Sequence, residues 1–182
     1  MSQPTSPSNG DATEEIPWKS WAGFALGEQG WDVFEKFISH RTWLLVRRDG
    51  ACGTLYREVL VEPFRLRAAA DPLFDATAKH HVWTDEFKEL ADQPDTYVLV
   101  VLAGMPLVKL EFLVFGCAEY AQLLACAPIA IGHGPAYRDV AFSRVKDSPD
   151  RWVMHRAPDF STVDAATVVD VSQHAHAFGK LR

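Results

Sequence analysis

Hydrophobic positions are most concentrated between Tyr97 and Phe115, and their order predicts a buried β-hairpin. The stretch up to Val108 is uncharged and rich in β-branched residues, which favours a strand. A Gly-Met-Pro break interrupts it, and beyond the break apolar residues alternate with Lys109 and Glu111. Alternation with period two is typical of an antiparallel strand with one buried face. We therefore expect the core of the protein here, with the face that carries Lys109 and Glu111 partly solvated.

The same segment does not have the pattern of a membrane span. A transmembrane helix needs about 20 mostly apolar residues. The uncharged run ends at Lys109, and Pro106 lies inside it. A charge near the bilayer centre costs a few kcal/mol or more. We therefore expect no association with a membrane.

Two further hairpins are predicted from segments with strand-like composition. Residues 42–48 and 54–62 form the first pair, joined across Asp49-Gly50, a dipeptide favoured in hairpin turns. Residues 136–145 and 151–157 form the second pair, around a turn at 147–150. With the central hairpin they predict a mainly antiparallel sheet.

Helical patterns lie between and after these hairpins. Apolar residues recur at helical spacing from Trp31, and Asp71-Pro72 is a capping residue followed by a proline at the first helical position. Ser161 and Asp164 resemble a capping box at the start of a last helix. The predicted helices cover residues 31–40, 72–80, 84–91, 117–127 and 161–178.

These elements predict an α+β fold, in which three β-hairpins build a mainly antiparallel sheet and helices pack mostly on one face. Residues 1–17 are rich in Pro, Ser and Thr, carry three carboxylates and contain no Lys or Arg. We expect them to be a disordered acidic tail, and residues 18–182 to form one α+β domain.

Composition narrows the function classes. The chain has 182 residues and a formal net charge of −6, with acidic residues concentrated in 71–96 and basic ones in 41–67. This layout suits a charged partner or self-association, whereas nucleic-acid binding requires a concentrated basic face. Three cysteines without metal-like spacing, and a start without a basic flank or apolar stretch, indicate a reducing cytoplasm. No cofactor is predicted.

Candidate catalytic chemistry centres on His133, which lies between two glycines and precedes Pro135. A loop histidine of this kind could act as a general base or a ligand, or it could simply occupy a turn. His155 lies near it if the last two predicted strands pair, and Glu119 or Asp139 could supply a carboxylate. Nucleophile, phosphate-loop and zinc-protease motifs are absent from the sequence.

Candidate partner-binding residues are Trp18, Trp21 and Phe24, which adjoin the acidic tail. Tryptophan is enriched at the centres of protein interfaces. These side chains either fold back over the sheet or dock on another molecule. The function that we expect is a small interaction module of the adaptor, chaperone-like or inhibitor type, bound to another protein or to itself. The alternative is a small enzyme or metal-binding protein that uses His133 with His155 or a nearby carboxylate.

Overall fold

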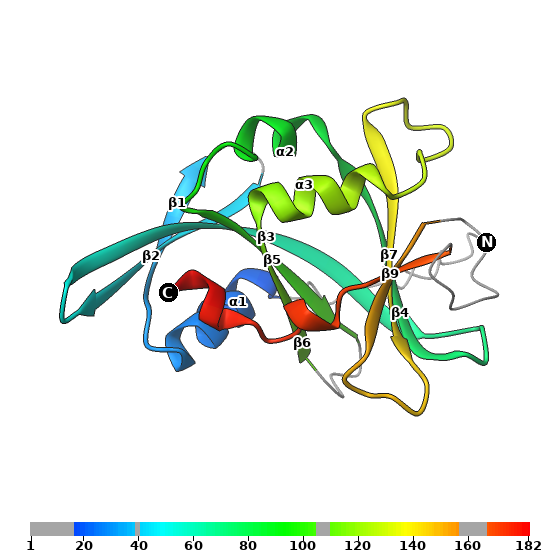
Figure 1. The fold of residues 1–182 in the computed structure, drawn as a ribbon, viewed down its shortest axis with the longest axis horizontal. Coiled ribbons are helices and arrows are strands. Elements are labelled where there is room, and N and C mark those ends of the chain that lie inside the picture. Colours follow the sequence, from blue (N-terminus) through cyan, green and yellow to red (C-terminus); the bar gives the residue numbers. More distant parts are fainter. Residues whose placement is uncertain (1–16, 39–40, 105–109, 157–166) are drawn as a thin grey trace, which may run out of the picture.

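The computed structural model describes residues 17–38, 41–104, 110–156 and 167–182 (Figure 1). Within these residues nine strands form one connected sheet, in the order β1-β2-β3-β4-β7-β8-β9, with β5 and β6 added beside β3. The strands are β1 (Asp32–Ile38), β2 (Arg41–Gly50), β3 (Gly53–Ala68), β4 (Phe74–Trp83), β5 (Thr96–Ala103), β6 (Leu110–Gly116), β7 (Tyr137–Val145), β8 (Trp152–His155) and β9 (Val168–Asp170). The helices are α1 (Trp18–Glu28), α2 (Asp85–Leu90) and α3 (Cys117–Ala125), followed by the short 3₁₀ turns η1 (Ser172–His174) and η2 (Phe178–Leu181).

Strand β3 connects the two halves of the sheet. It pairs with β2 in the antiparallel direction as far as Val61, and with β5 in parallel from Glu58 to Arg65. Only its last residues, Leu66 to Ala68, pair with β4. The sheet therefore changes partners along one strand, so β2 and β4 approach β3 at different points of its length.

Side chains on both faces of the β3–β5 region are buried. Along β5, Val98 and Val100 belong to one core, whereas Leu99 and Val101 belong to the other. The first core is closed by α2, α3 and the second half of the sheet, and the second core is closed by α1 and the last 3₁₀ turn, η2 (Figure 1). A strand buried on both faces has few polar positions, which explains the continuous apolar run in the sequence.

The predicted central hairpin is confirmed, because β5 and β6 pair in the antiparallel direction and residues 98–103 are fully buried. The prediction that Glu111 lies on a solvated face is wrong. Glu111 is 3% exposed and bonded to Arg144 and His176. Lys109 lies outside the described residues. None of the helices in the described ranges is long and apolar enough to cross a membrane.

The predicted α+β class is wrong, because the described chain is mostly antiparallel strand. Residues 31–40 and 72–80 were expected to be helical, yet they contribute β1 and most of β4. Both segments contain apolar residues whose spacing also fits period two, and β2 and β7 supply the strand edges that select this conformation. The other two predicted hairpins are confirmed as β2–β3 and β7–β8.

Two further expectations about the helices fail. The helix predicted for residues 161–178 is absent from its described part, which instead holds β9 and 3₁₀ turns; residues 161–166 lie outside the described ranges. The helices also do not share one face, since α1 covers the face opposite α2 and α3. Apart from Pro17, the predicted acidic tail lies outside the described residues.

Gly104 follows β5 at the point where β3 turns towards β4. A Cβ atom on Gly104 would lie 2.7 Å from the carbonyl oxygen of Leu66, so the backbone of one strand would have to move. We expect Gly104→Ala to lower the free energy of unfolding by about 2 kcal/mol. Gly27→Ala, in α1 with nothing within 4 Å of its added Cβ, should instead stabilise the protein by up to about 1 kcal/mol. Urea denaturation of both variants measures the contrast, and equal effects would contradict the close approach at Gly104.

Candidate functional site

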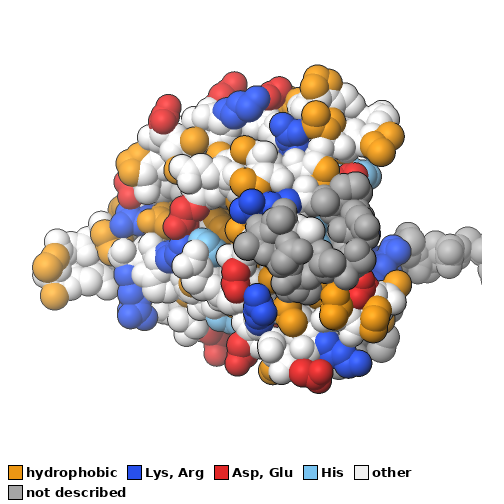
Figure 2. Space-filling model, turned by 45° about the vertical axis from the view of Figure 1, so that its right-hand side comes forward, with side chains coloured by type: hydrophobic (Ala, Val, Ile, Leu, Met, Phe, Trp, Pro, Cys, Tyr) orange, Lys and Arg blue, Asp and Glu red, His pale blue; other side chains and the backbone are white. Residues whose placement is uncertain are grey.

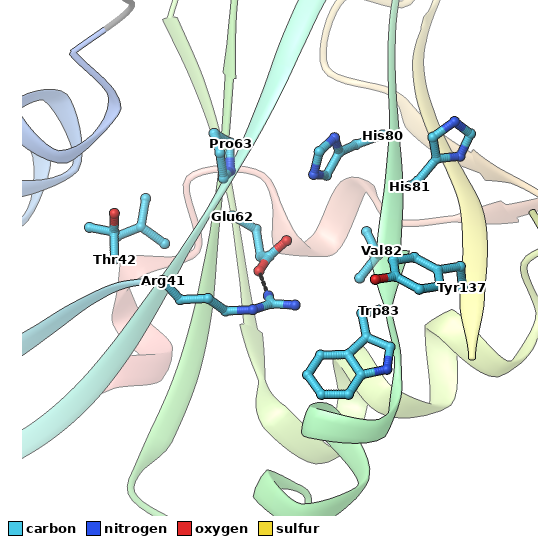
Figure 3. Close-up of a pocket in the computed structure, with 10 residues that line it drawn as sticks. Arg41, Thr42, Glu62, Pro63, His80, His81, Val82, Trp83 and Tyr137 are labelled. Atoms are coloured by element: carbon cyan, nitrogen blue, oxygen red, sulfur yellow. Dashed lines mark hydrogen bonds and ion pairs between the residues drawn. The ribbon is translucent and has the colours of Figure 1, made fainter. Parts of the chain in front are cut away.

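The main candidate site is the gap where β3 and β4 separate, which we call the fork (Figure 3). The strands pair at Leu66 and Ala78, and the rings of Phe64 and His80 still touch at 5.5 Å between centroids. Beyond this contact they diverge, and the gap between them is a pocket of about 320 Å³. Its lining residues are Arg41, Thr42, Val61, Glu62, Pro63, His80, His81, Val82, Trp83 and Tyr137.

A buried ion pair lies on the β2–β3 side of the fork. Arg41 donates to Glu62, and their side chains are only 15% and 5% exposed. The Arg41 guanidinium also stacks over the ring of Phe87, 5.3 Å from its centroid. Because both side chains are largely shielded from water, the attraction between the two charges is strong. The pair therefore holds a guanidinium and a carboxylate in fixed orientations at the pocket surface.

Tyr120 of α3 is coupled electrostatically to this pair. It is fully buried, and its hydroxyl has no hydrogen-bond partner among the described residues. Burial raises the pKa of Tyr120 well above its ordinary value; the Glu62 carboxylate raises it further, and Arg41 opposes the change. The hydroxyl therefore stays protonated and carries no charge inside the first hydrophobic core.

The β4 side of the fork combines an imidazole with two exposed aromatic rings. Burial lowers the pKa of His80, and the nearby His81 and Arg41 lower it further, so the His80 ring is neutral at pH 7. Trp83 and Tyr137 face each other across β4 and β7 and are 38% and 36% exposed. Figure 3 shows His80 and the hydroxyl end of Tyr137 directed towards the gap, whereas His81 points away from it.

The backbone of β4 is also available in the fork. Between His80 and Trp83, β4 pairs with β7 on one edge, and its other edge has no strand partner among the described residues. The amide of Thr84 donates to Ala136 beside β7. Because successive residues of a strand direct their backbone groups to opposite edges, the amides of His81 and Trp83 face the fork.

His133 lies beside this site, in the loop between α3 and β7. Its ring is 4.3 Å from that of His81 and 5.8 Å from that of Tyr137, measured between centroids. His81 in turn bonds to Asp139 at 2.5 Å. Of the two suggested carboxylates, the structure thus places Asp139 near His133, with His81 between them. Within the described ranges, no group of three or more His, Cys, Asp or Glu side chains is arranged to hold a metal ion.

His155 does not join His133. It is 1% exposed and lies at the other end of β7, where its Nε2 is 2.9 Å from the hydroxyl of Ser143. Ser143 is fully buried and also bonded to Thr77, and the ring of Phe74 packs edge-on against His155. The contact between Ser143 and His155 therefore links the neighbouring strands β7 and β8 inside the protein. Glu119, the other suggested carboxylate, is bonded to Lys180.

The predicted partner-binding residues lie on α1, which folds back onto the sheet. Trp18 packs against the core, and its ring meets that of Trp21 edge-on at 6.0 Å between centroids. Phe24 is 69% exposed. Folding back therefore accounts for Trp18, while Phe24 remains on the surface. Helix α1 covers the face of the sheet opposite α2 and α3.

Sequence reasoning missed most residues of the fork. His80 ends the helix predicted for residues 72–80 and His81 follows it directly, and adjacent residues of a helix diverge by about 100°. On a strand they lie on opposite faces, which places one in the pocket and the other at Asp139. The available signal was Pro63, because a proline inside a strand marks a position without a ladder partner on that side. It indicates where the fork opens.

Comparisons of the chain with protein-family models, with curated proteins and with solved structures gave no match. The function must therefore be argued from the site. Its lining offers oriented donors and acceptors, exposed aromatic rings and an unpaired strand edge. Among the described lining residues, Thr42 has the one aliphatic hydroxyl that could serve as a nucleophile. No described hydrogen bond joins this hydroxyl to His80. A lining of this kind can hold a ligand through hydrogen bonds and aromatic contacts.

Proposed function

We propose that the protein is a protein-binding module that takes an extended segment of a partner protein into the fork by strand addition. The observation that carries the proposal is the edge of β4 from His80 to Trp83, which pairs with no strand among the described residues and borders the pocket. Free strand edges bind other chains readily, and proteins usually cover or block them. In strand addition, main-chain hydrogen bonds provide the affinity and side-chain pockets provide the selectivity.

The dimensions and chemistry of the fork support a peptide as the occupant. Its volume of about 320 Å³ is at the lower end for ligand pockets, which suits a short segment rather than a folded domain. Trp83 and Tyr137 at its rim would pack on an apolar side chain of the segment. The Arg41–Glu62 pair offers both a donor and an acceptor to a polar group. The enzyme alternative has less support, because His133 and His155 lie at opposite ends of β7.

A cytoplasmic location is part of the same proposal. Cys52, Cys117 and Cys126 are free thiols, and two of them are exposed. Exposed free thiols are compatible with a reducing compartment. The proposed interaction requires no cofactor.

Selection from a displayed library of random peptides tests the proposal. We expect enriched peptides to bind in extended conformation and to slow hydrogen exchange at the amides of His81 and Trp83, since these amides would become bonded to the peptide. Trp83→Ala should weaken binding tenfold or more, because a stacked aromatic contact is lost. Protection located on α1 instead would move the binding site to Trp18, Trp21 and Phe24.

A pair of substitutions at one position isolates the backbone contribution. His81→Ala keeps the amide and should bind the selected peptides within a few-fold of the wild type. His81→Pro removes the amide on the open edge of β4, where proline is tolerated, and should abolish binding. Thermal melts of both variants check that the fold is retained. If His81→Pro unfolds, the exchange measurement on the wild-type protein decides alone. Equal affinity of two folded variants would refute strand addition.

A further inference from the structure

The β2–β3 hairpin extends beyond the rest of the sheet as a two-stranded arm, formed by residues 48–57 (Figure 1). On the β2 side the neighbouring strand β1 ends at the pair Asp32–Arg47, and on the β3 side β5 begins at the pair Glu58–Thr96. Leu55 and Tyr56 are 39% and 52% exposed on this arm, and Figure 2 shows hydrophobic side chains at its end. Among the described residues no third strand pairs with the arm. A two-stranded hairpin alone is at best marginally stable in water.

The residues of β3 that direct their backbone groups to the outer edge of the arm can be identified. The amide of Glu58 donates to the carbonyl of Asp95, which lies on the side away from β2. Because backbone groups alternate along a strand, Tyr56 and Thr54 direct their amides and carbonyls to this same outer side. The Tyr56 carbonyl accepts one bond from the side chain of Arg57 and keeps a second lone pair. No strand among the described residues pairs with this edge at Thr54 or Tyr56.

This edge is complementary to itself. If two copies of β3 pair antiparallel about a two-fold axis at Leu55, Thr54 of each copy falls opposite Tyr56 of the other. Both residues direct their backbone groups outward, so each such pair exchanges two hydrogen bonds. Leu55 then faces Leu55, at the close distance of a pair that is not hydrogen-bonded. Arg57 falls opposite Gly53, so no like charges meet across the axis.

The base of the arm also has room for the tip of a second arm. A cavity of about 410 Å³ lies between the arm and the loop before β5, lined by Leu45, Tyr56, Arg57, Glu58, Asp92, Gln93, Pro94, Asp95 and Thr96. In the register centred on Leu55, the turn of the partner arm reaches the level of Glu58. That turn consists of Gly50, Ala51, Cys52 and Gly53, whose small side chains require little space.

We propose that the protein forms a two-fold symmetric dimer in which the outer edges of the two arms pair antiparallel, centred on Leu55, to give a sheet continuous through both copies. The register, the outward backbone groups and the cavity at the arm base all select a second copy of this chain as the occupant. The dimer leaves the fork open, so it does not depend on the proposed peptide binding.

Light scattering coupled to size-exclusion chromatography, over a concentration series, tests the dimer. The wild-type protein should have twice the monomer mass at high concentration. Leu55→Lys places two like charges opposite each other at the axis and should lower the association constant at least tenfold. Leu73→Lys is the matched control, because Leu73 is 40% exposed and lies outside the arm; it should remain dimeric. A wild-type protein that stays monomeric overturns the proposal, as does a Leu73→Lys variant that dissociates equally.

A charge-reversal experiment tests the register itself. Leu55→Lys and Leu55→Asp should each be monomeric, whereas their equimolar mixture should form a heterodimer, because opposite charges then meet at the axis. Melting temperatures of the single variants establish that both are folded, as expected for an exposed position. If the mixture remains monomeric while both variants are folded, the axis does not pass through Leu55 and the proposal fails. Peptide binding in the fork is expected to be unchanged in all these variants.

Discussion

The free energy of unfolding is expected to fall by about 2 kcal/mol between about pH 7 and about pH 4.5 because of His155 alone. Burial lowers the pKa of this histidine to about 4; the charge of Lys79 adds to the effect, and Asp71 opposes it. In the unfolded chain the ring has its ordinary pKa of about 6.5. Between about pH 6.5 and about pH 4 the ring binds a proton in the unfolded state but not in the folded state, so the free energy of unfolding falls as the pH falls. The full effect, reached below about pH 4, is about 3 kcal/mol.

Urea denaturation as a function of pH measures this effect, and two variants isolate it. His155→Gln retains a side chain able to bond to Ser143 but cannot titrate, so its stability should fall less steeply between about pH 6.5 and about pH 4. His133→Gln, at an exposed position, should retain the wild-type slope. His80 and His174 also have a lowered pKa and the same sign of dependence, so the difference between variants is the decisive quantity. Identical slopes for His155→Gln and the wild type would contradict the burial of a neutral ring.

Local patterns predicted the elements whose neighbours lie close in sequence. The hairpin β2–β3, the hairpin β5–β6 and helix α3 all follow from turn residues, β-branched runs and a helix-forming segment of the chain. The strands β1 and β4 were mistaken for helices, because Trp31, Phe34 and Phe37 recur at helical spacing and Asp71-Pro72 resembles a helix start. Their conformation depends on β2 and β7, and pairing of that kind is absent from the local pattern.

The fork could be predicted only in part. Pro63 indicates a strand position without a partner, but Arg41 and His80 reach it from strands whose register is set by distant pairing. His133 was singled out correctly as a loop residue between glycines with positive φ, at Gly132 and Gly134. Its proximity to His81 depends on the antiparallel pairing of β4 with β7, which the helical assignment of residues 72–80 excluded from consideration.

The burial of Glu111 could not be predicted from the local pattern either, because its partners are residues 144 and 176, which are distant in the sequence. Its carboxylate accepts from Arg144 at 3.3 Å and is 2.8 Å from the Nε2 of His176. Arg144 also binds Asp75 and lies over the ring of Trp152. A period-two pattern at Glu111 normally indicates a solvated face. Here charged groups from two other segments cover that face, and the side chain is 4% exposed.

Removal of Arg144 is therefore expected to have a large effect. Arg144→Met leaves the buried Glu111 carboxylate without its guanidinium and should lower the free energy of unfolding by about 3 kcal/mol or more. The double variant Glu111→Leu with Arg144→Met removes both charges and should recover most of that loss, since apolar side chains of similar volume often replace a buried pair without cost. Arg151→Met, which breaks the exposed pair of Arg151 with Asp170, should cost less than about 1 kcal/mol. Chemical denaturation of the wild type, Glu111→Leu, Arg144→Met and the double variant gives the coupling between Glu111 and Arg144 directly, with Arg151→Met as the control. Additive losses in the double variant would mean that the two charges act separately and that Glu111 is stabilised by other groups.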